Sequence, residues 1–89
     1  MSWTFFSNHG HVYFLLAKNG DLTIRELSIK VGITDRCVQN IINDLEFSEY
    51  IKKNKIGRVN HYKVNEKKYL RHDLESNVSL DDLVKIINK

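Results

Sequence analysis

Three segments of the chain repeat apolar side chains at positions i, i+3, i+4 and i+7, the spacing that gives a helix one apolar face. The three stripes are Ile24/Leu27/Ser28/Val31, Val38/Ile41/Ile42/Leu45 and Leu80/Leu83/Val84/Ile87. Ahead of them, residues 12–17 are apolar all round. This run predicts a central, mostly buried helix over residues 8–18, capped by Ser7 or Asn8 and ended by Gly20.

The later helices begin at recognisable capping residues. Thr23 and Glu26 have the T-x-x-E spacing of a capping box, in which each side chain binds the backbone N–H of the other residue. Gly32 can take the left-handed conformation that ends such a helix. In the same way, Thr34 is expected to begin a third helix and Ser79 a fourth.

After the third helix the pattern changes to that of short strands. Tyr50-Ile51 and Tyr62-x-Val64 have the aromatic and β-branched composition of half-buried strands. The polar, basic stretch KKNKIGRVN joins them, with Gly57 at the expected hairpin tip.

These elements, in this order, predict a mainly α fold with a small β-hairpin (α+β), the winged helix-turn-helix. Eighty-nine residues supply apolar material for one core, so residues 1–89 are expected to form a single domain. Within it we expect the helix-turn-helix at 23–48, the wing at 51–65 and a C-terminal helix at 79–88.

Positive charge is concentrated in one part of the chain. The net charge is +3, yet residues 51–71 hold eight basic side chains and one acid, a local charge of +7. The segments on either side, 1–50 and 72–89, each carry −2. Such asymmetry is typical of an element that binds phosphates.

The second helix of a helix-turn-helix fits the major groove of B-DNA, which is about 12 Å wide. Because the apolar stripe of the third helix faces the core, the opposite face presents Asp35, Arg36, Gln39, Asn40 and Asn43. These residue types suit base edges. Phosphate contacts are expected from Thr23, Arg25 and Thr34, and the wing adds Lys53, Lys55, Arg58 and Asn60 along the backbone or minor groove. The sequence therefore predicts a sequence-specific regulator that binds double-stranded DNA.

Two other functions stay open. The net acidity of the third helix suits a winged helix used as a protein-interaction or assembly module, whose acidic helix meets a basic partner. The other alternative is an RNA-binding winged helix.

The segment LTIRELSIKVGITDRCVQNIINDLEFSEYIKKNKIGRVNHYKV resembles winged helix-turn-helix transcriptional regulators of bacteria and archaea, the MarR- and ArsR-like group. The similarity extends to a small single-domain subgroup through NHGHV, VGITDR, GRVNHY and RHDLE. It implies DNA binding, commonly as a homodimer on a two-fold site, with a recognition helix at 34–48 and a wing at 52–61. Two residues depart from the subgroup: Glu49 stands where Gly is usual, and Asp73 where Pro is common.

Other chemistry finds little support in the sequence. There is no nucleophile with a neighbouring base, no phosphate-cradling glycine loop and no pair of catalytic carboxylates, so we expect no enzyme and no cofactor. Cys37 and the four histidines lack metal-ligand spacing, so no metal site is expected. Cys37 is expected to lie partly buried beside the core stripe, and a redox switch there stays open.

Both ends of the sequence carry apolar residues, and the N-terminal end has more aromatic side chains than a terminus usually exposes. Trp3, Phe5 and Phe6 either cover the core together with the Leu80–Ile87 helix or form a dimer seam with it, and we favour a homodimer. No membrane segment or signal peptide is found in the pattern. A cytoplasmic, prokaryotic protein, associated with the nucleoid when bound, is therefore expected.

Overall fold

A computed structural model describes residues 3–88 of the chain. Its elements are α1 (Asn8–Lys18), α2 (Ile24–Val31), α3 (Asp35–Phe47), β1 (Ile51–Ile56), β2 (Val59–Val64) and α4 (Leu80–Ile87). The predicted order of helices and hairpin is confirmed, whereas residues 1, 2 and 89 of the predicted domain lie outside the described residues. No helix among the described residues is long and apolar enough to cross a membrane.

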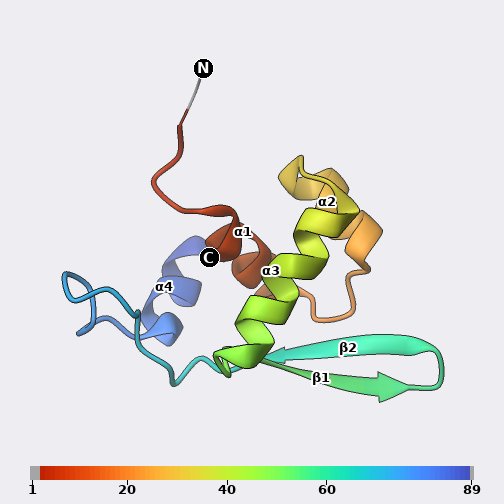
Figure 1. The fold of residues 1–89 in the computed structure, drawn as a ribbon. Coiled ribbons are helices and arrows are strands. Elements are labelled where there is room, and N and C mark those ends of the chain that lie inside the picture. The colour runs from red at the N-terminus through yellow and green to blue at the C-terminus, as the bar shows by residue number, and fades with distance from the viewer. Residues whose placement is uncertain (1–2, 89) are drawn as a thin grey trace.

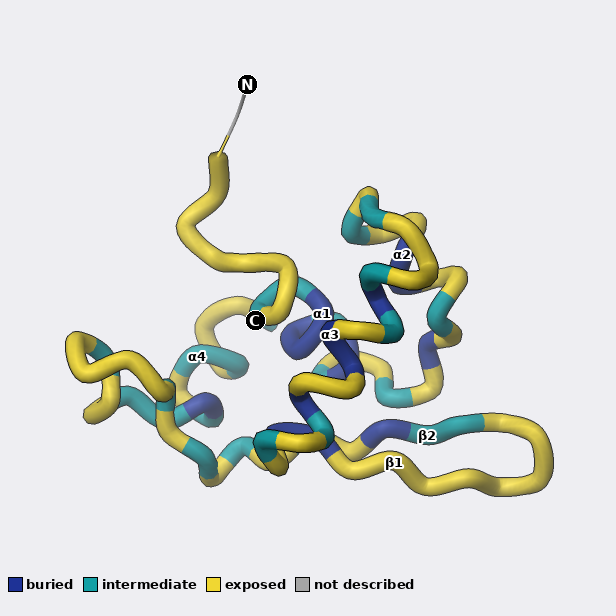
Figure 2. Tube along the Cα trace, viewed as in Figure 1, coloured by how far each residue is buried: buried dark blue, intermediate teal, exposed yellow. Residues whose placement is uncertain are grey.

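The core forms around α1, which lies in the centre of the molecule (Figure 1). Val12 and Leu16 of α1 are fully buried together with Leu27 of α2 and Val38 and Ile42 of α3. The predicted stripes of α2 and α3 thus face one core. In contrast to this core, the outer half of the β1–β2 hairpin is exposed throughout (Figure 2).

The predicted caps at Thr23, Gly32, Thr34 and Ser79 are confirmed. The Thr23 side chain accepts from the Glu26 backbone N–H, and the Glu26 carboxylate accepts from the Thr23 N–H at 3.0 Å. Gly32 ends α2 at φ +84°. Thr34 and Ser79 accept from backbone N–H groups in the first turns of α3 and α4 in the same manner.

The prediction for Gly20 is wrong. Helix α1 ends at Lys18 with Asn19 as its extended C-cap, and Gly20 is not left-handed. Its role is a close approach: a Cβ there would lie 2.1 Å from the Tyr62 carbonyl oxygen, and the Tyr62 N–H donates to the Gly20 carbonyl at 2.9 Å. The glycine therefore lets the loop between α1 and α2 reach the outer edge of β2.

The strands are longer than the sequence pattern predicts. Residues 52–56 and 59–61 were expected to belong to the connection, but they pair across the hairpin up to the Gly57–Arg58 turn. Apart from Ile56 and Val59, their side chains are polar, and they are largely exposed on both faces, so they carry no alternation for the pattern to detect. Backbone hydrogen bonds alone extend the ladder outward from its buried base.

The corner between α3 and β1 has the backbone conformation that a glycine usually adopts. Glu49 takes φ +64°, the left-handed conformation, and the Tyr50 N–H donates to the Leu45 carbonyl at 2.8 Å. This is the hydrogen-bond pattern of a Schellman helix end. The corner therefore keeps its geometry although Glu49 replaces the usual glycine, and the backbone of Glu49 is strained.

Candidate nucleic-acid interface

The outward face of α3 carries the predicted groove-reading side chains. Arg36, Asn40 and Asn43 are exposed and Gln39 is half-buried, while the apolar stripe on the other side of α3 packs in the core. Gln39 donates to Asn43 at 2.9 Å, so these two amides form a linked pair. The face keeps free donors and acceptors of the kind that base edges require.

The predicted site residues at the start of α2 and α3 form a connected group. The guanidinium of Arg25 lies 3.3 Å from the Asp35 carboxylate, an ion pair that joins the two helices of the motif. The neighbouring Ser28 hydroxyl and then Arg25 hold the pKa of Asp35 below its usual range. Asp35 therefore has an internal partner, which competes with its predicted contact to a base edge.

Thr23 and Thr34 are both exposed, and both use their hydroxyl oxygens as acceptors in helix caps. The hydroxyl hydrogen of each remains available as a donor. A phosphate oxygen could therefore be bound without loss of either cap.

The register of the hairpin divides its basic side chains between two faces. Residues directly opposite each other in an antiparallel pair point to the same side, and successive residues alternate. Lys53 and Lys55, opposite Tyr62 and Asn60, therefore share the face of the buried Ile51, which packs against the helices. Lys52 and Lys63, opposite each other, project from the other face.

No Lys or Arg of the wing is in an ion pair with a carboxylate of the described residues. The hairpin from residue 51 to 64 contains five Lys and Arg and no Asp or Glu. Within residues 3–88, the ion pairs of basic residues involve Arg25, Lys85 and histidines, and none involves Arg36 or a Lys or Arg of the hairpin. The Lys and Arg side chains of the hairpin therefore form a cationic arm that, among the described residues, is free of ion pairs.

The acidic side chains of α3 lie away from the centre of its outward face. Asp44 is bound by the His9 ring of α1 at 2.8 Å, and Asp35 by Arg25. Glu46 is near Tyr62, whose pKa is raised by burial first and by the charge of Glu46 second. Two of the acids that the sequence shows, Asp35 and Asp44, are thus engaged within the protein.

One residue of this face was missed by the sequence analysis. Phe47 is 91% exposed at the end of α3. It lies seven positions after Asn40 and eleven after Arg36, a helical spacing that places the three on one line. That spacing was the available signal, but an aromatic residue at a helix end is usually assigned to the core.

The wing is attached to the rest of the protein through β2. Besides the Tyr62–Gly20 hydrogen bond, the His61 ring is bound to the Asp21 carboxylate in the same loop. Both contacts join residues about forty positions apart. They determine how the cationic arm is held relative to α1 and α3.

Cys37 and the histidines are the residues considered for other chemistry. Cys37 is half-buried against the core, as predicted. The histidines are dispersed, with His9 on Asp44, His61 on Asp21 and His72 beside Glu75. Within the described part of the chain, no three His, Cys, Asp or Glu side chains are grouped as metal ligands.

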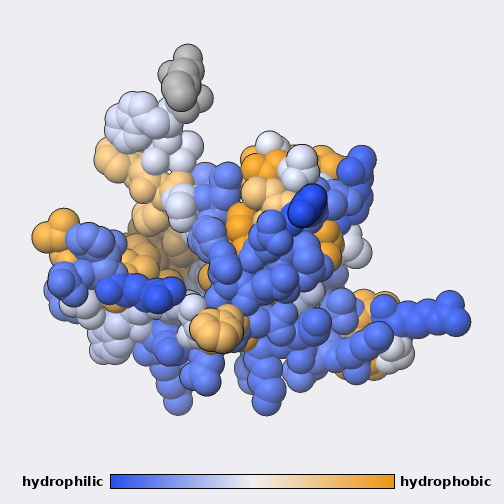
Figure 3. Space-filling view, in the orientation of Figure 1, coloured by the Kyte–Doolittle hydropathy of each residue, from blue (hydrophilic) through white to orange (hydrophobic). Residues whose placement is uncertain are grey.

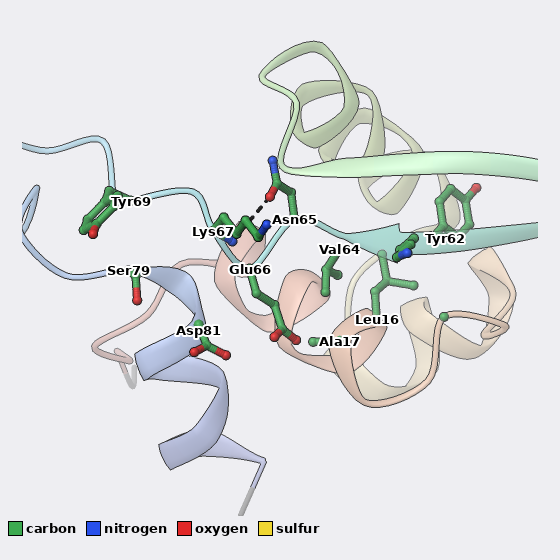
Figure 4. Close-up of a pocket in the computed structure, with 12 residues that line it drawn as sticks. Leu16, Ala17, Tyr62, Val64, Asn65, Glu66, Lys67, Tyr69, Ser79 and Asp81 are labelled. Carbon is green, nitrogen blue, oxygen red and sulfur yellow. Dashed lines mark hydrogen bonds between the residues drawn. The ribbon is translucent and has the colours of Figure 1, made fainter.

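A cleft of about 990 Å³ lies between α1, the chain after β2 and the start of α4 (Figure 4). It brings together Glu66 and Asp81, a carboxyl pair that the sequence analysis did not find. Burial first, and then the hydrogen bond with Asp81, raises the pKa of Glu66, while the Lys85 ammonium at 3.0 Å lowers that of Asp81. The Asp81 N–H also donates to the Glu66 carbonyl at 2.9 Å, so the pair fastens α4 to the segment that follows the wing.

Comparison with known proteins agrees with this geometry. No protein-family model matches the chain, and no curated protein sequence matches it. Among solved structures, it is similar to the zinc-dependent MarR family transcriptional regulator AdcR in its Zn(II)-bound state, with a TM-score of 0.57 and 23% sequence identity. The fold is a winged helix-turn-helix. The match covers 74% of this chain and 47% of that structure, so the chain spans about half the length of this neighbour.

Proposed function

We propose that the protein is a transcriptional regulator that binds double-stranded DNA in a sequence-specific manner. In this proposal α3 lies in the major groove and the wing lies on the backbone and minor groove. The observation that carries it is the cationic hairpin, which contains five Lys and Arg and no Asp or Glu, beside a polar, exposed face of α3. The full contact set is Thr23, Arg25, Thr34, Asp35, Arg36, Gln39, Asn40, Asn43, Lys53, Lys55, Arg58 and Asn60.

The two parts of this surface have different roles. Phosphate contacts from Lys53, Lys55 and Arg58 supply affinity that does not depend on sequence and falls steeply with salt. Base contacts from Arg36 and its neighbours supply selectivity. The fold of the structural neighbour, itself a transcriptional regulator, supports the same assignment.

The two faces of the hairpin allow a matched test. K53A/K55A and K52A/K63A remove the same charge from the same two-stranded element, on opposite faces. We expect K53A/K55A to weaken binding to every duplex and to reduce the slope of log K against log salt by about 2. K52A/K63A should change the slope less, and equal effects of the two variants would contradict the assignment of faces.

Selectivity is tested with a duplex obtained by in vitro selection. Arg36→Ala should reduce discrimination between the selected site and a scrambled duplex, by about tenfold or more, without removing the salt dependence. If the wild-type protein binds all duplexes equally at moderate salt, it is no sequence-specific regulator.

We further propose that the regulator is a homodimer. Trp3 and Phe5 are 76% and 90% exposed and pack edge-to-face on each other, so neither side chain is buried against the core. Phe5 and Leu83 of α4 line one apolar depression of about 830 Å³, and Figure 3 shows hydrophobic residues gathered between the N-terminal arm and α4. W3S/F5S should convert a dimer to a monomer in analytical ultracentrifugation, and a monomeric wild-type protein at micromolar concentration would refute the dimer.

A second candidate function is favoured by Phe47. An almost fully exposed Phe beside Asn43 suits a protein partner, because aromatic side chains are enriched in the cores of protein interfaces. In that case the protein is an interaction or assembly module. Stoichiometric capture of one protein that Phe47→Ser abolishes, with no binding to duplex DNA even at low salt, would establish it in place of DNA binding.

A further inference from the structure

The tip of the wing carries two exposed apolar side chains directly opposite each other. Ile56 and Val59 form the last pair of the ladder before the Gly57–Arg58 turn, and they are 67% and 51% exposed. Among the described residues, neither belongs to the core or packs against it. The space around Gly57 is open, since nothing lies within 4 Å of the position a Cβ would take.

An exposed apolar side chain by itself is ordinary. The setting of this pair is more specific, because each member directly follows a cation: Ile56 follows Lys55, and Val59 follows Arg58. The register places Lys55 with Asn60 on one face of the ribbon and the Ile56–Val59 pair on the other. The tip is therefore cationic on one face and at its turn, and apolar on the other face.

These two properties restrict what the tip can bind. Five cations without a carboxylate in the hairpin favour an anionic partner. The apolar pair requires that this partner also offer apolar surface. The minor groove of DNA has both, because its walls carry phosphates while sugar rings and base edges line its interior. It is about 6 Å wide, so the end of the ribbon can enter where the whole ribbon cannot.

We propose that Ile56 and Val59 enter the minor groove next to the major-groove site of α3 and pack on A·T base pairs. This inference rests on the proposed DNA-binding function and adds a specificity determinant to it. The N2 amino group of guanine projects into the minor groove and obstructs apolar side chains there, which is the reason for the A·T preference. Apolar side chains inserted in this way also bend the duplex, as in minor-groove architectural proteins.

The experiment uses the protein of residues 1–89 and an in vitro selected duplex. The base pairs next to the α3 site are changed from A·T to G·C and to I·C, since inosine presents the major-groove edge of guanine but lacks its N2 amino group. For the wild-type protein, G·C should weaken binding about five- to tenfold, and I·C should restore it.

The matched variant is I56T/V59T, which keeps two β-branched side chains and every charge of the wing. It should bind the A·T duplex about tenfold more weakly, with the wild-type salt slope. It should also bind A·T, G·C and I·C duplexes alike and bend the duplex less in an end-to-end energy-transfer measurement.

Several results would overturn the inference. If I56T/V59T distinguishes the three duplexes as well as the wild-type protein does, or if I·C fails to restore binding, the tip does not read the minor groove. In that case DNA binding itself stands. A variant that changes only the oligomeric state assigns the tip to a protein contact instead. A wild-type protein that binds no duplex overturns the inference together with the proposed function.

Discussion

Replacement of Gly20 by alanine tests how the wing is held on the rest of the protein. The added Cβ would lie 2.1 Å from the Tyr62 carbonyl oxygen, a backbone atom that no side-chain rotation can move away. To reach the 3.4 Å at which ordinary contact begins, loop and strand must separate by about 1.3 Å. The Tyr62–Gly20 hydrogen bond of 2.9 Å does not survive such a shift.

The expected loss of stability follows from these two effects. The hydrogen bond accounts for about 1 kcal/mol. Displacement of β2, which carries the buried Tyr62, corresponds to an overpacked site at about 1–3 kcal/mol. A total of roughly 2–4 kcal/mol lowers the melting temperature of a domain this small by about 10–25 °C. At temperatures where the variant remains folded, its wing is displaced, so DNA affinity should fall as well.

Gly10→Ala is the matched control. Its Cβ would lie 3.4 Å from the Phe6 Cβ, an ordinary contact, inside helix α1. Alanine in a helix stabilises by about 0.5–1 kcal/mol over glycine, so this variant should be as stable as the wild-type protein or more so.

Urea unfolding followed by far-UV circular dichroism measures both variants. The single tryptophan, Trp3, lies in the exposed arm and is a poor probe of the core. If Gly20→Ala unfolds at the wild-type urea concentration, or if Gly10→Ala loses as much stability, the close approach of Gly20 to Tyr62 is refuted.

Three other predictions concern the corner, the carboxyl pair and a helix cap. Glu49→Gly should raise the free energy of unfolding by about 0.5–1 kcal/mol, because it removes the left-handed strain at φ +64°. Glu49→Ala keeps the strain and should not stabilise the protein. An equal gain from alanine in urea unfolding would implicate the carboxylate instead. Because the pKa of Glu66 is raised in the folded state, its contribution is present below the ordinary glutamate pKa and is lost as pH rises through the raised value. Glu66→Gln should therefore raise the melting temperature at pH 7 relative to the wild-type protein but not at pH 4, and a gain that is the same at both pH values would contradict the shift. Thr23→Ala should cost about 1 kcal/mol in urea unfolding, since it removes the cap of α2, and an unchanged midpoint would show that the cap contributes nothing.

The helices and their ends were readable because their interactions are local. The Thr23–Glu26 box, the Thr34 cap and the left-handed Gly32 each depend on residues within about four positions, so the sequence pattern contains the whole interaction. The concentration of positive charge in the wing is likewise a property of composition, independent of any pairing.

What only the tertiary structure decided depends on residues far apart in the chain. Gly20 was read as a helix end because its partner, Tyr62, is 42 positions away. Two ion pairs also became visible only in the tertiary structure. Arg25 binds Asp35 and His9 binds Asp44, although the sequence pattern gave neither acid a partner. The polar strands carried no alternation, so their length, and with it the separation of Lys53 from Lys52 onto opposite faces, was set by the register of the backbone ladder. The ladder is made by backbone N–H and C=O groups, so polar side chains along it leave no pattern in the sequence. For that reason the sequence by itself predicted that this protein has a basic wing, but not which of its cations share a face.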